Sequence, residues 1–200
     1  MTINGLVPDP DVPGAWVVRV GGADQSWIDP RDPSRLEFDY MQRIAAHLDA
    51  HAPAGERMRV VHIGGAGMSL ARYVAHTRPS SPQIVCEPDV ELTQAVREAA
   101  PLPRNSGIKV RPVDGRTGLA TMPDDYADVV IIDAFVGTQV PASLVTVEAF
   151  AEQLHWRVRS ECGYEPAGTP AGPASSACST AREPAAHRAR SAARRGGLSH

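Results

Sequence analysis

The residues with the clearest chemical potential lie in a glycine turn and in an acid further along the chain. An apolar run over 60–63 leads into a turn whose glycines are Gly64, Gly65 and Gly67, and a second apolar run ends on Glu87. The 20 residues from Gly67 to Glu87 are the separation expected when a strand, a turn, a helix and a second strand bind a nucleoside. Glycines let a ligand approach the backbone, and the carboxylate accepts hydrogen bonds from ribose hydroxyls. The spacing therefore predicts a site for an adenosine-type ligand.

Two further acids follow apolar runs later in the chain. Asp114, with Gly115 after it, follows the run over 107–113, and Asp133 ends the run over 127–133. Neighbouring parallel strands end at one edge of a sheet, so the glycine turn and the three acids are expected to face one crevice. Each feature alone also has a structural explanation, because glycine turns serve tight packing and an acid after a strand often caps a helix.

The chain from residue 58 to residue 156 alternates strand and helix patterns. Each of four apolar runs is followed by a helical pattern, and Asp89 is expected to cap one of these helices. The expected pairs are 58–63 with 67–77, 83–87 with 89–99, 107–113 with 115–121, and 127–133 with 143–156. Continuously apolar strands are typical of a parallel sheet with helices on both faces. The expected fold class is therefore α/β, with a Rossmann-like, doubly wound parallel sheet.

A small β-hairpin is expected ahead of this sheet. Two β-rich runs flank a turn-type cluster within 15–29, and Ser34 and Glu37 form a capping-box pattern that predicts a helix running to about residue 50. The expected division is a hairpin region over 1–30, a nucleoside-binding domain over 31–156 and a tail over 157–200.

The tail over 157–200 differs in composition from the body of the chain. It holds 7 arginines and 3 glutamates, a net charge of +4 against −7 for residues 1–156, and its only large aliphatic residue after 160 is Leu198. A segment this poor in apolar residues is expected to be disordered. Two other interpretations are a basic arm for RNA or another anionic partner, and translation of a GC-rich gene out of frame. The acidic body argues against a nucleic-acid surface, which needs clustered cations.

Other classes of protein are disfavoured by composition. No apolar run approaches the roughly 20 residues that span a membrane, and the N-terminus does not have the pattern of a secretory signal, so a cytoplasmic location is expected. Cys86, Cys162 and Cys178 lack CxxC spacing and the histidines lack a ligand pattern, so no metal site is expected. His62 is expected to be a packed core residue. Tyr40 could line the crevice, although aromatic residues at such positions are more typical of a core.

Taken together, these residues resemble one enzyme family. Over about residues 14–155 the chain is similar to the polyamine aminopropyltransferases, the spermidine synthases and their relatives, within the class I S-adenosylmethionine-dependent methyltransferase fold. Gln25 in the hairpin and LEFDY at 36–40 match the family's hairpin-to-helix entry, and Gln25 is included among the expected donor-binding residues.

The resemblance also implies roles for the residues of the crevice. The glycine turn and Glu87 would hold the sugar and the methionine-derived part of the nucleoside. Asp114, paired with Gly115, would contact the adenine. Asp133 would be the catalytic residue, which binds and deprotonates an amine acceptor. The donor would be S-adenosylmethionine or its decarboxylated form, bound as a substrate without a metal.

Two departures from the family pattern concern acids. Spermidine synthases usually read GGGDGG at the first turn and Asp-x-x-Asp-Pro after the fourth strand, whereas this chain has Gly67 and Val136 at the positions of those two further aspartates. A polyamine carries several positive charges, so these losses weaken amine recognition more than nucleoside recognition. The fold also normally adds three strands after the helix ending near 156, and none is recognisable. The strand over 127–133 would then be an open edge, which invites pairing with another chain, such as a second copy.

Three functions remain open on the sequence. The first is a spermidine synthase-like transferase of polyamine biosynthesis. The second is a methyltransferase of an unknown small acceptor, because the two donors differ only in a carboxylate. The third is an inactive nucleoside-binding fragment. In either transfer a carboxylate such as Asp133 can orient an amine and take its proton, since amines are mostly protonated at neutral pH. A nicotinamide dehydrogenase is less favoured, because Leu70 replaces the last glycine of the dinucleotide motif.

Overall fold

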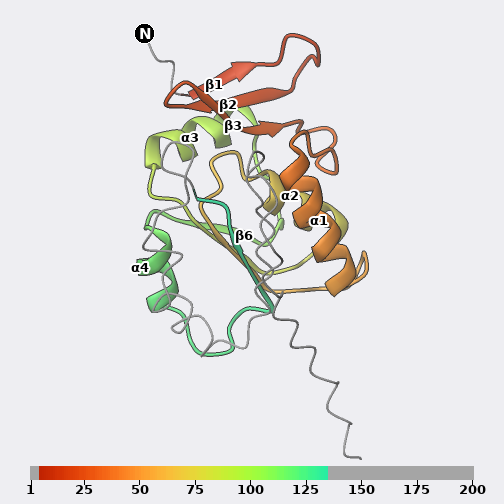
Figure 1. The fold of residues 1–200 in the computed structure, drawn as a ribbon, viewed down its shortest axis with the longest axis vertical. Helices are drawn as coiled ribbons and strands as arrows, with labels where there is room; N and C mark the ends of the chain where they lie inside the picture. The colour runs from red at the N-terminus through yellow and green to blue at the C-terminus, as the bar shows by residue number, and fades with distance from the viewer. Residues whose placement is uncertain (1–4, 135–200) are drawn as a thin grey trace, which may run out of the picture. The chain divides into compact units, whose positions relative to one another are not determined.

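The computed structural model of the chain describes residues 5–134, which form a parallel sheet, an antiparallel sheet and four helices (Figure 1). The chain divides into two units, Met1–Tyr164 and Glu165–His200, and every described residue lies in the first. The helix expected over 143–156 and the tail over 157–200, with Cys162 and Cys178, lie outside the described residues. Within residues 5–134, no helix is long and apolar enough to cross a membrane.

The parallel sheet has the strand order β6-β5-β4-β7, as expected for a doubly wound fold. Its strands are β4 (Val60–Ile63), β5 (Gln83–Cys86), β6 (Ile108–Arg111) and β7 (Val129–Ile132). Each lies inside a run that was expected to be a strand, and β4 and β5 are buried at every position. Ile63 pairs with Cys86 on one side and Ile132 on the other, and Cys86 pairs with Arg111. The four strands therefore end at one level, which confirms the common edge.

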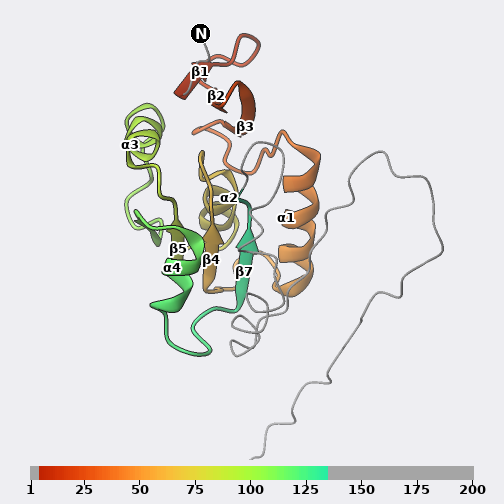
Figure 2. The same ribbon diagram turned by 60° about the vertical axis from the view of Figure 1, so that its left-hand side comes forward.

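Helices cover both faces of this sheet. The helices are α1 (Asp39–His51), α2 (Ser69–Thr77), α3 (Val90–Ala99) and α4 (Gly115–Ala120). Residues of α1 and α2 pack with Val60 and Ile131 on one face, and Leu119 of α4 packs with Val61 and Ile63 on the other. Figure 2 shows the strands between α1 and α4. Packing on both faces explains why most strand positions are apolar, and the two buried polar residues, His62 and Gln83, bond to each other.

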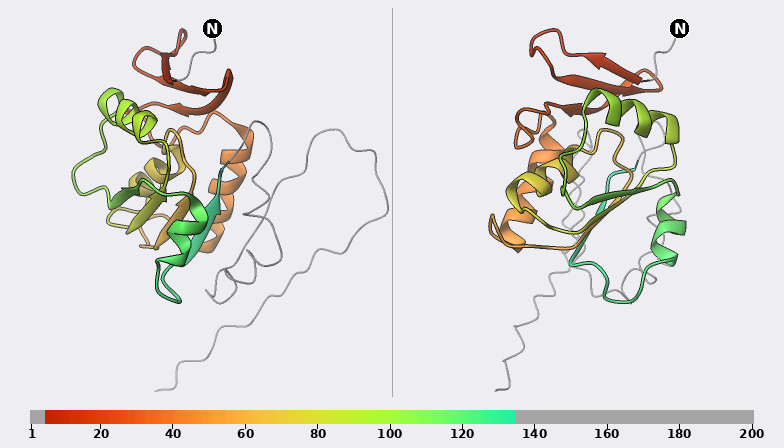
Figure 3. Two further views of the ribbon diagram at one scale, coloured as in Figure 1. Left: turned by 90° about the vertical axis from the view of Figure 1, so that its left-hand side faces the viewer. Right: turned by 180° about the vertical axis from the view of Figure 1, so that it is seen from behind.

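The antiparallel sheet has the order β1-β2-β3. Its strands are β1 (Gly5–Pro8), β2 (Trp16–Val20) and β3 (Ala23–Ile28). The hairpin of β2 and β3 was expected, whereas β1 was not. Val18 and Ile28 of this sheet join a buried cluster with Val85 of β5 and Leu92 of α3. This cluster joins the antiparallel sheet to β5 and α3, and Figure 3 shows that sheet next to α3.

The prediction of the capping box was wrong. Helix α1 begins at Asp39, and its N-cap residue, Phe38, makes no side-chain cap hydrogen bond. The Ser34 hydroxyl and backbone N–H both donate to the Asp32 carboxylate, and Glu37 pairs with Arg35. Asp32 thus forms a local turn that competes with helix initiation. The Asp89 cap is confirmed, because its carboxylate accepts a hydrogen bond from the Leu92 N–H at 2.8 Å.

Candidate functional site

The glycine turn after β4 presses against the end of β7. Gly64 has a φ of +79°, and a Cβ at this position would collide with the carbonyl oxygen of Asp133 and lie 2.9 Å from the Cα of Ala134. The Gly64 N–H donates to the Cys86 carbonyl at 2.9 Å, and the Asp133 N–H donates to the Ile63 carbonyl at 2.8 Å. Glycine is required here because two backbones touch. This contact places Asp133 directly beside the turn.

Asp133 is paired with a tyrosine from the first turn of α1. The Tyr40 hydroxyl donates a hydrogen bond to the Asp133 carboxylate. Burial raises the pKa of Asp133 to about 6, against the lowering effect of the Tyr40 bond. Burial, and then the neighbouring Asp133 charge, raise the pKa of Tyr40, so that its proton stays on the phenol. The pair presents one carboxyl that changes charge near neutral pH and one fixed donor.

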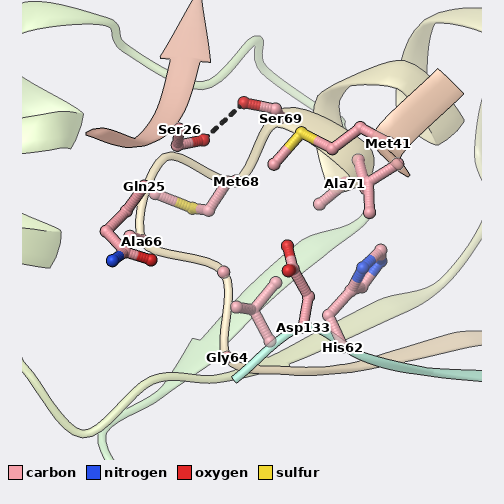
Figure 4. A pocket seen from close by; sticks show the side chains of 13 residues that line it. Gln25, Ser26, Met41, His62, Gly64, Ala66, Met68, Ser69, Ala71 and Asp133 are labelled. Carbon is pink, nitrogen blue, oxygen red and sulfur yellow. Dashed lines mark hydrogen bonds between the residues drawn. The ribbon is translucent and has the colours of Figure 1, made fainter. Parts of the chain in front are cut away.

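A cavity opens in front of the Asp133 carboxyl. It lies where the strand order reverses, between the ends of β4 and β7, and the hairpin supplies Gln25 and Ser26 to its wall. Figure 4 shows the Asp133 carboxyl pointing into the space bordered by Met41 and Met68. The reversal point of a doubly wound sheet is where such folds bind ligands. The cavity volume is about 30 Å³, which suits the end group of a ligand rather than a whole nucleoside.

Glu87 lies on the same edge of the sheet but outside the cavity wall. Its carboxylate accepts hydrogen bonds from the backbone N–H of Asp89, at 3.0 Å, and of Gly65. Burial raises the pKa of Glu87. Because it bonds to Gly65, this acid is tied to the glycine turn from the side opposite Asp133. A ligand that contacts both acids would pass over the turn.

The other expected site residues have local structural partners. Asp114 is the N-cap of α4 and accepts hydrogen bonds from the N–H and hydroxyl of Thr117, which lower its pKa. Gly115 is buried in the first turn of α4. A Cβ on Gly67 would collide with the Ser26 hydroxyl and lie 3.1 Å from Ile28, so this glycine packs against the hairpin.

The cavity therefore brings together only part of the expected set. Among the described residues, its wall includes four of the predicted positions, namely Gln25, Gly64, Gly65 and Asp133. Gly67, Glu87, Asp114 and Gly115 lie at the same edge of the sheet but not in this wall. Within residues 5–134, no group of three His, Cys, Asp or Glu side chains is arranged to hold a metal ion.

Two residues of the site received little weight in the sequence. Tyr40 was noted as a residue that could line the crevice; it lies outside the cavity wall but next to the Asp133 carboxyl, whose pKa it lowers. His62 is buried, as expected for a core residue, but it also lines the cavity. The signal that could have identified Tyr40 is its place within LEFDY, the segment that resembles the family's entry into this helix.

Arg72 of α2 anchors the turn from behind. The residue is 5% exposed, and its guanidinium donates to the carbonyl oxygens of Gly67, Ala100 and Pro101. Burial lowers the pKa of this guanidinium to about 10. The side chain thereby links the turn before α2 to the C-terminal end of α3.

Comparisons with known proteins identify solved structures that are similar to this chain. No protein-family model and no curated protein matches the chain. A solved structure described as a probable spermidine synthase from Corynebacterium glutamicum is 34% identical, with a TM-score of 0.68, over 77% of this chain and 56% of that one. A spermidine synthase in complex with the transition-state analogue AdoDATO is 21% identical, with a TM-score of 0.53, over 76% of this chain and 50% of that one.

A methyltransferase that is not described as a spermidine synthase has a similar fold. Human methyltransferase-like protein 13, in complex with SAH, is 16% identical, with a TM-score of 0.52, over 60% of each chain. The chain thus spans 50–60% of the length of these three structures. The fold is the Rossmann-like fold of class I methyltransferases. Within that fold class, the chain is similar to a probable spermidine synthase over 77% of its length.

Proposed function

We propose that the crevice at the strand ends binds S-adenosylmethionine or its decarboxylated form and transfers a group from the sulfonium to an acceptor beside Asp133. The observation that carries this proposal is the Asp133 carboxyl, bonded to Tyr40 and facing a cavity at the reversal point of the sheet. Complexes of similar folds with SAH and AdoDATO support a sulfur-linked adenosyl ligand.

The donor would lie across the glycine turn. Glu87 retains acceptor capacity for ribose hydroxyls beyond its two backbone hydrogen bonds, since a carboxylate has about four lone-pair sites. Gly64 and Gly65 leave the backbone accessible next to it, and Gln25 faces the same space from the hairpin. The Asp114–Gly115 pair would meet the adenine at the next strand end.

The acceptor would lie in the cavity. The nitrogen lone pair of an amine attacks the carbon bonded to the sulfonium, the carbon–sulfur bond breaks, and its electron pair stays on sulfur as a neutral thioether. Asp133, ionised above its pKa of about 6, accepts the proton that the amine releases. Tyr40 holds the carboxylate in place through its hydrogen bond. The same steps describe aminopropyl and methyl transfer.

Calorimetric titration tests the donor half of this proposal. The free protein is titrated with S-adenosylmethionine, its decarboxylated analogue, methylthioadenosine and NAD. We expect heat from the three adenosyl-sulfur ligands and none from NAD, and tighter binding of the decarboxylated donor would assign aminopropyl transfer. Tighter binding of S-adenosylmethionine would assign methyl transfer. Binding of no adenosyl-sulfur ligand would refute both transfers and leave the inactive-fragment interpretation.

A further inference from the structure

Within residues 5–134, the cavity in front of Asp133 has one charged side chain in its wall. Among the described residues of its wall, Asp133 is the one acid, and no lysine or arginine is present. The hydroxyls of Ser26 and Ser69 are already engaged, because Ser69 donates to the Trp27 carbonyl at 2.6 Å and accepts from Ser26 at 2.8 Å. Their oxygens keep lone pairs that can accept a hydrogen bond, but these neutral hydroxyls supply no second negative charge.

His62 adds no charge to the cavity at neutral pH. Gln83 donates its amide N–H to the Ala71 carbonyl at 3.0 Å, so its amide oxygen accepts from Nε2 of His62 at 2.8 Å. This chain of bonds fixes the neutral tautomer with the proton on Nε2. Burial lowers the pKa of His62 to about 4, which keeps the ring neutral in the physiological range.

The remaining wall near Asp133 is apolar. Met68 is 3% exposed and adopts a left-handed conformation, with φ of +57°, that few residues other than glycine favour. Together with Met41 and Ala71 it borders the space that the Asp133 carboxyl faces (Figure 4), and Leu70 also lines the cavity. The neighbouring position 67 cannot supply an acid, because any Cβ there meets Ser26 and Ile28.

We propose that this cavity selects a compact monoamine as acceptor, with its ammonium against Asp133 and its chain against Met41 and Met68, and that it discriminates against diamines. The inference rests on the proposed function and names the acceptor class for it. One carboxylate neutralises one ammonium, whereas the second ammonium of a diamine would meet only methionine and neutral polar groups among the described residues of the wall. Met68 is then the residue that determines specificity.

Two amines of equal chain length test the proposal. n-Butylamine and 1,4-diaminobutane differ by one terminal amino group, and each is titrated at about pH 8, where Asp133 is ionised. We expect n-butylamine to bind at least about tenfold more tightly. Equal or tighter binding of the diamine, or no binding of either amine, would overturn the inference.

The titration is run both with and without saturating methylthioadenosine. Methylthioadenosine binding without amine binding would refute the monoamine site and leave the donor half of the proposed function standing. If the protein fails to bind methylthioadenosine, the proposed function is refuted. The titration of the free protein with the two amines still shows whether the cavity prefers the monoamine or the diamine.

A matched pair of variants tests the role of Met68. Asp and Asn both tolerate the left-handed conformation and are nearly isosteric, so Met68→Asp and Met68→Asn lose the same apolar contacts. We expect Met68→Asp to raise the affinity for 1,4-diaminobutane relative to n-butylamine by about tenfold, and Met68→Asn to leave this ratio unchanged. An equal ratio in the two folded variants would show that Met68 does not determine specificity. If either variant fails to fold, the wild-type comparison of the two amines decides the inference.

Discussion

Asp133 combines a cost to stability with a chemical use. Its ordinary pKa of 3.8 rises to about 6 on folding, so between about pH 4 and pH 6 the folded state holds a proton that the unfolded state has lost. The free energy of unfolding therefore falls as pH rises through this window, and the cost is fully present above it. Asp133→Asn should raise the free energy of unfolding by roughly 1–3 kcal/mol at about pH 8, with little gain at about pH 4. Urea unfolding at the two pH values measures this.

The activity of the same variant should move in the opposite direction. Asn cannot accept a proton, so group transfer should be lost, and in the wild type the rate should fall as pH drops below about 6. Asp124→Asn, at an exposed position, is the control and should change neither quantity. If Asp133→Asn has wild-type stability at both pH values, the Asp133 carboxylate is not destabilised by burial as inferred.

Gly64 provides a second prediction at the residue scale. Gly64→Ala should cost about 3 kcal/mol or more, because the methyl group meets the backbone of Asp133 and Ala134 in addition to the strain of a positive φ. Gly55→Ala is a matched control, since Gly55 has a similar φ of +89° but no atom within 4 Å of an added Cβ. It should cost about 1 kcal/mol. Equal losses in the two variants, measured by denaturant unfolding, would show that the close approach of the turn to β7 is absent.

The sequence predicts the site residues that follow strand ends, because a local pattern marks them. It does not predict contacts between segments that are far apart in the chain. The turn glycines and Asp133 follow strand ends, which the sequence identifies through apolar runs. The bond between Tyr40 and Asp133 joins two segments far apart in the chain, so no local pattern reveals it. The packing of Gly67 against Ser26 depends on where the hairpin docks, for the same reason.

At the scale of elements, the sequence predicted the strands of the parallel sheet more accurately than the start of helix α1. Parallel strands that are buried on both faces are apolar at most positions, which is a strong signal. The start of α1 was misplaced because Asp32 captures Ser34 in a local turn. Strand β1 was missed because its stability comes from pairing, with Leu6 opposite Val18 in β2, and its short sequence ends in proline.

Arg72 allows a prediction about how elements are joined. Its guanidinium donates hydrogen bonds to backbone carbonyls of the turn and of the end of α3 at the same time. The compact ammonium of lysine cannot make this set of hydrogen bonds. Arg72→Lys should therefore lower the free energy of unfolding by about 2–4 kcal/mol. Arg97→Lys, on the exposed side of α3, should be nearly neutral. A neutral Arg72→Lys in the same unfolding assay would mean that the turn does not depend on this anchor.

At the scale of the whole molecule, the described region joins two sheets around one candidate site. The hairpin contributes Gln25 and Ser26 to a cavity whose floor belongs to the parallel sheet, so a bound ligand would contact both. Within residues 5–134, β7 pairs with β4 alone, and its other edge has no partner in that range. The chain also spans only 50–60% of the structures it matches. A ligand that bridges the two sheets should therefore contribute noticeably to the stability of this unit.

This bridging predicts a stability increase on donor binding. A ligand at one hundred times its Kd stabilises a folded protein by about 2.7 kcal/mol if it does not bind the unfolded chain. For a protein of this size, such a gain should raise the Tm by roughly 5–10 °C. Methylthioadenosine should produce this shift in differential scanning calorimetry, and NAD should not. Glu87→Ala should abolish most of the shift at the same ligand concentration, because it removes the acceptor for the ribose hydroxyls. If a folded Glu87→Ala protein shows the full Tm shift, the nucleoside does not bind through Glu87, and the proposed position of the ribose is wrong.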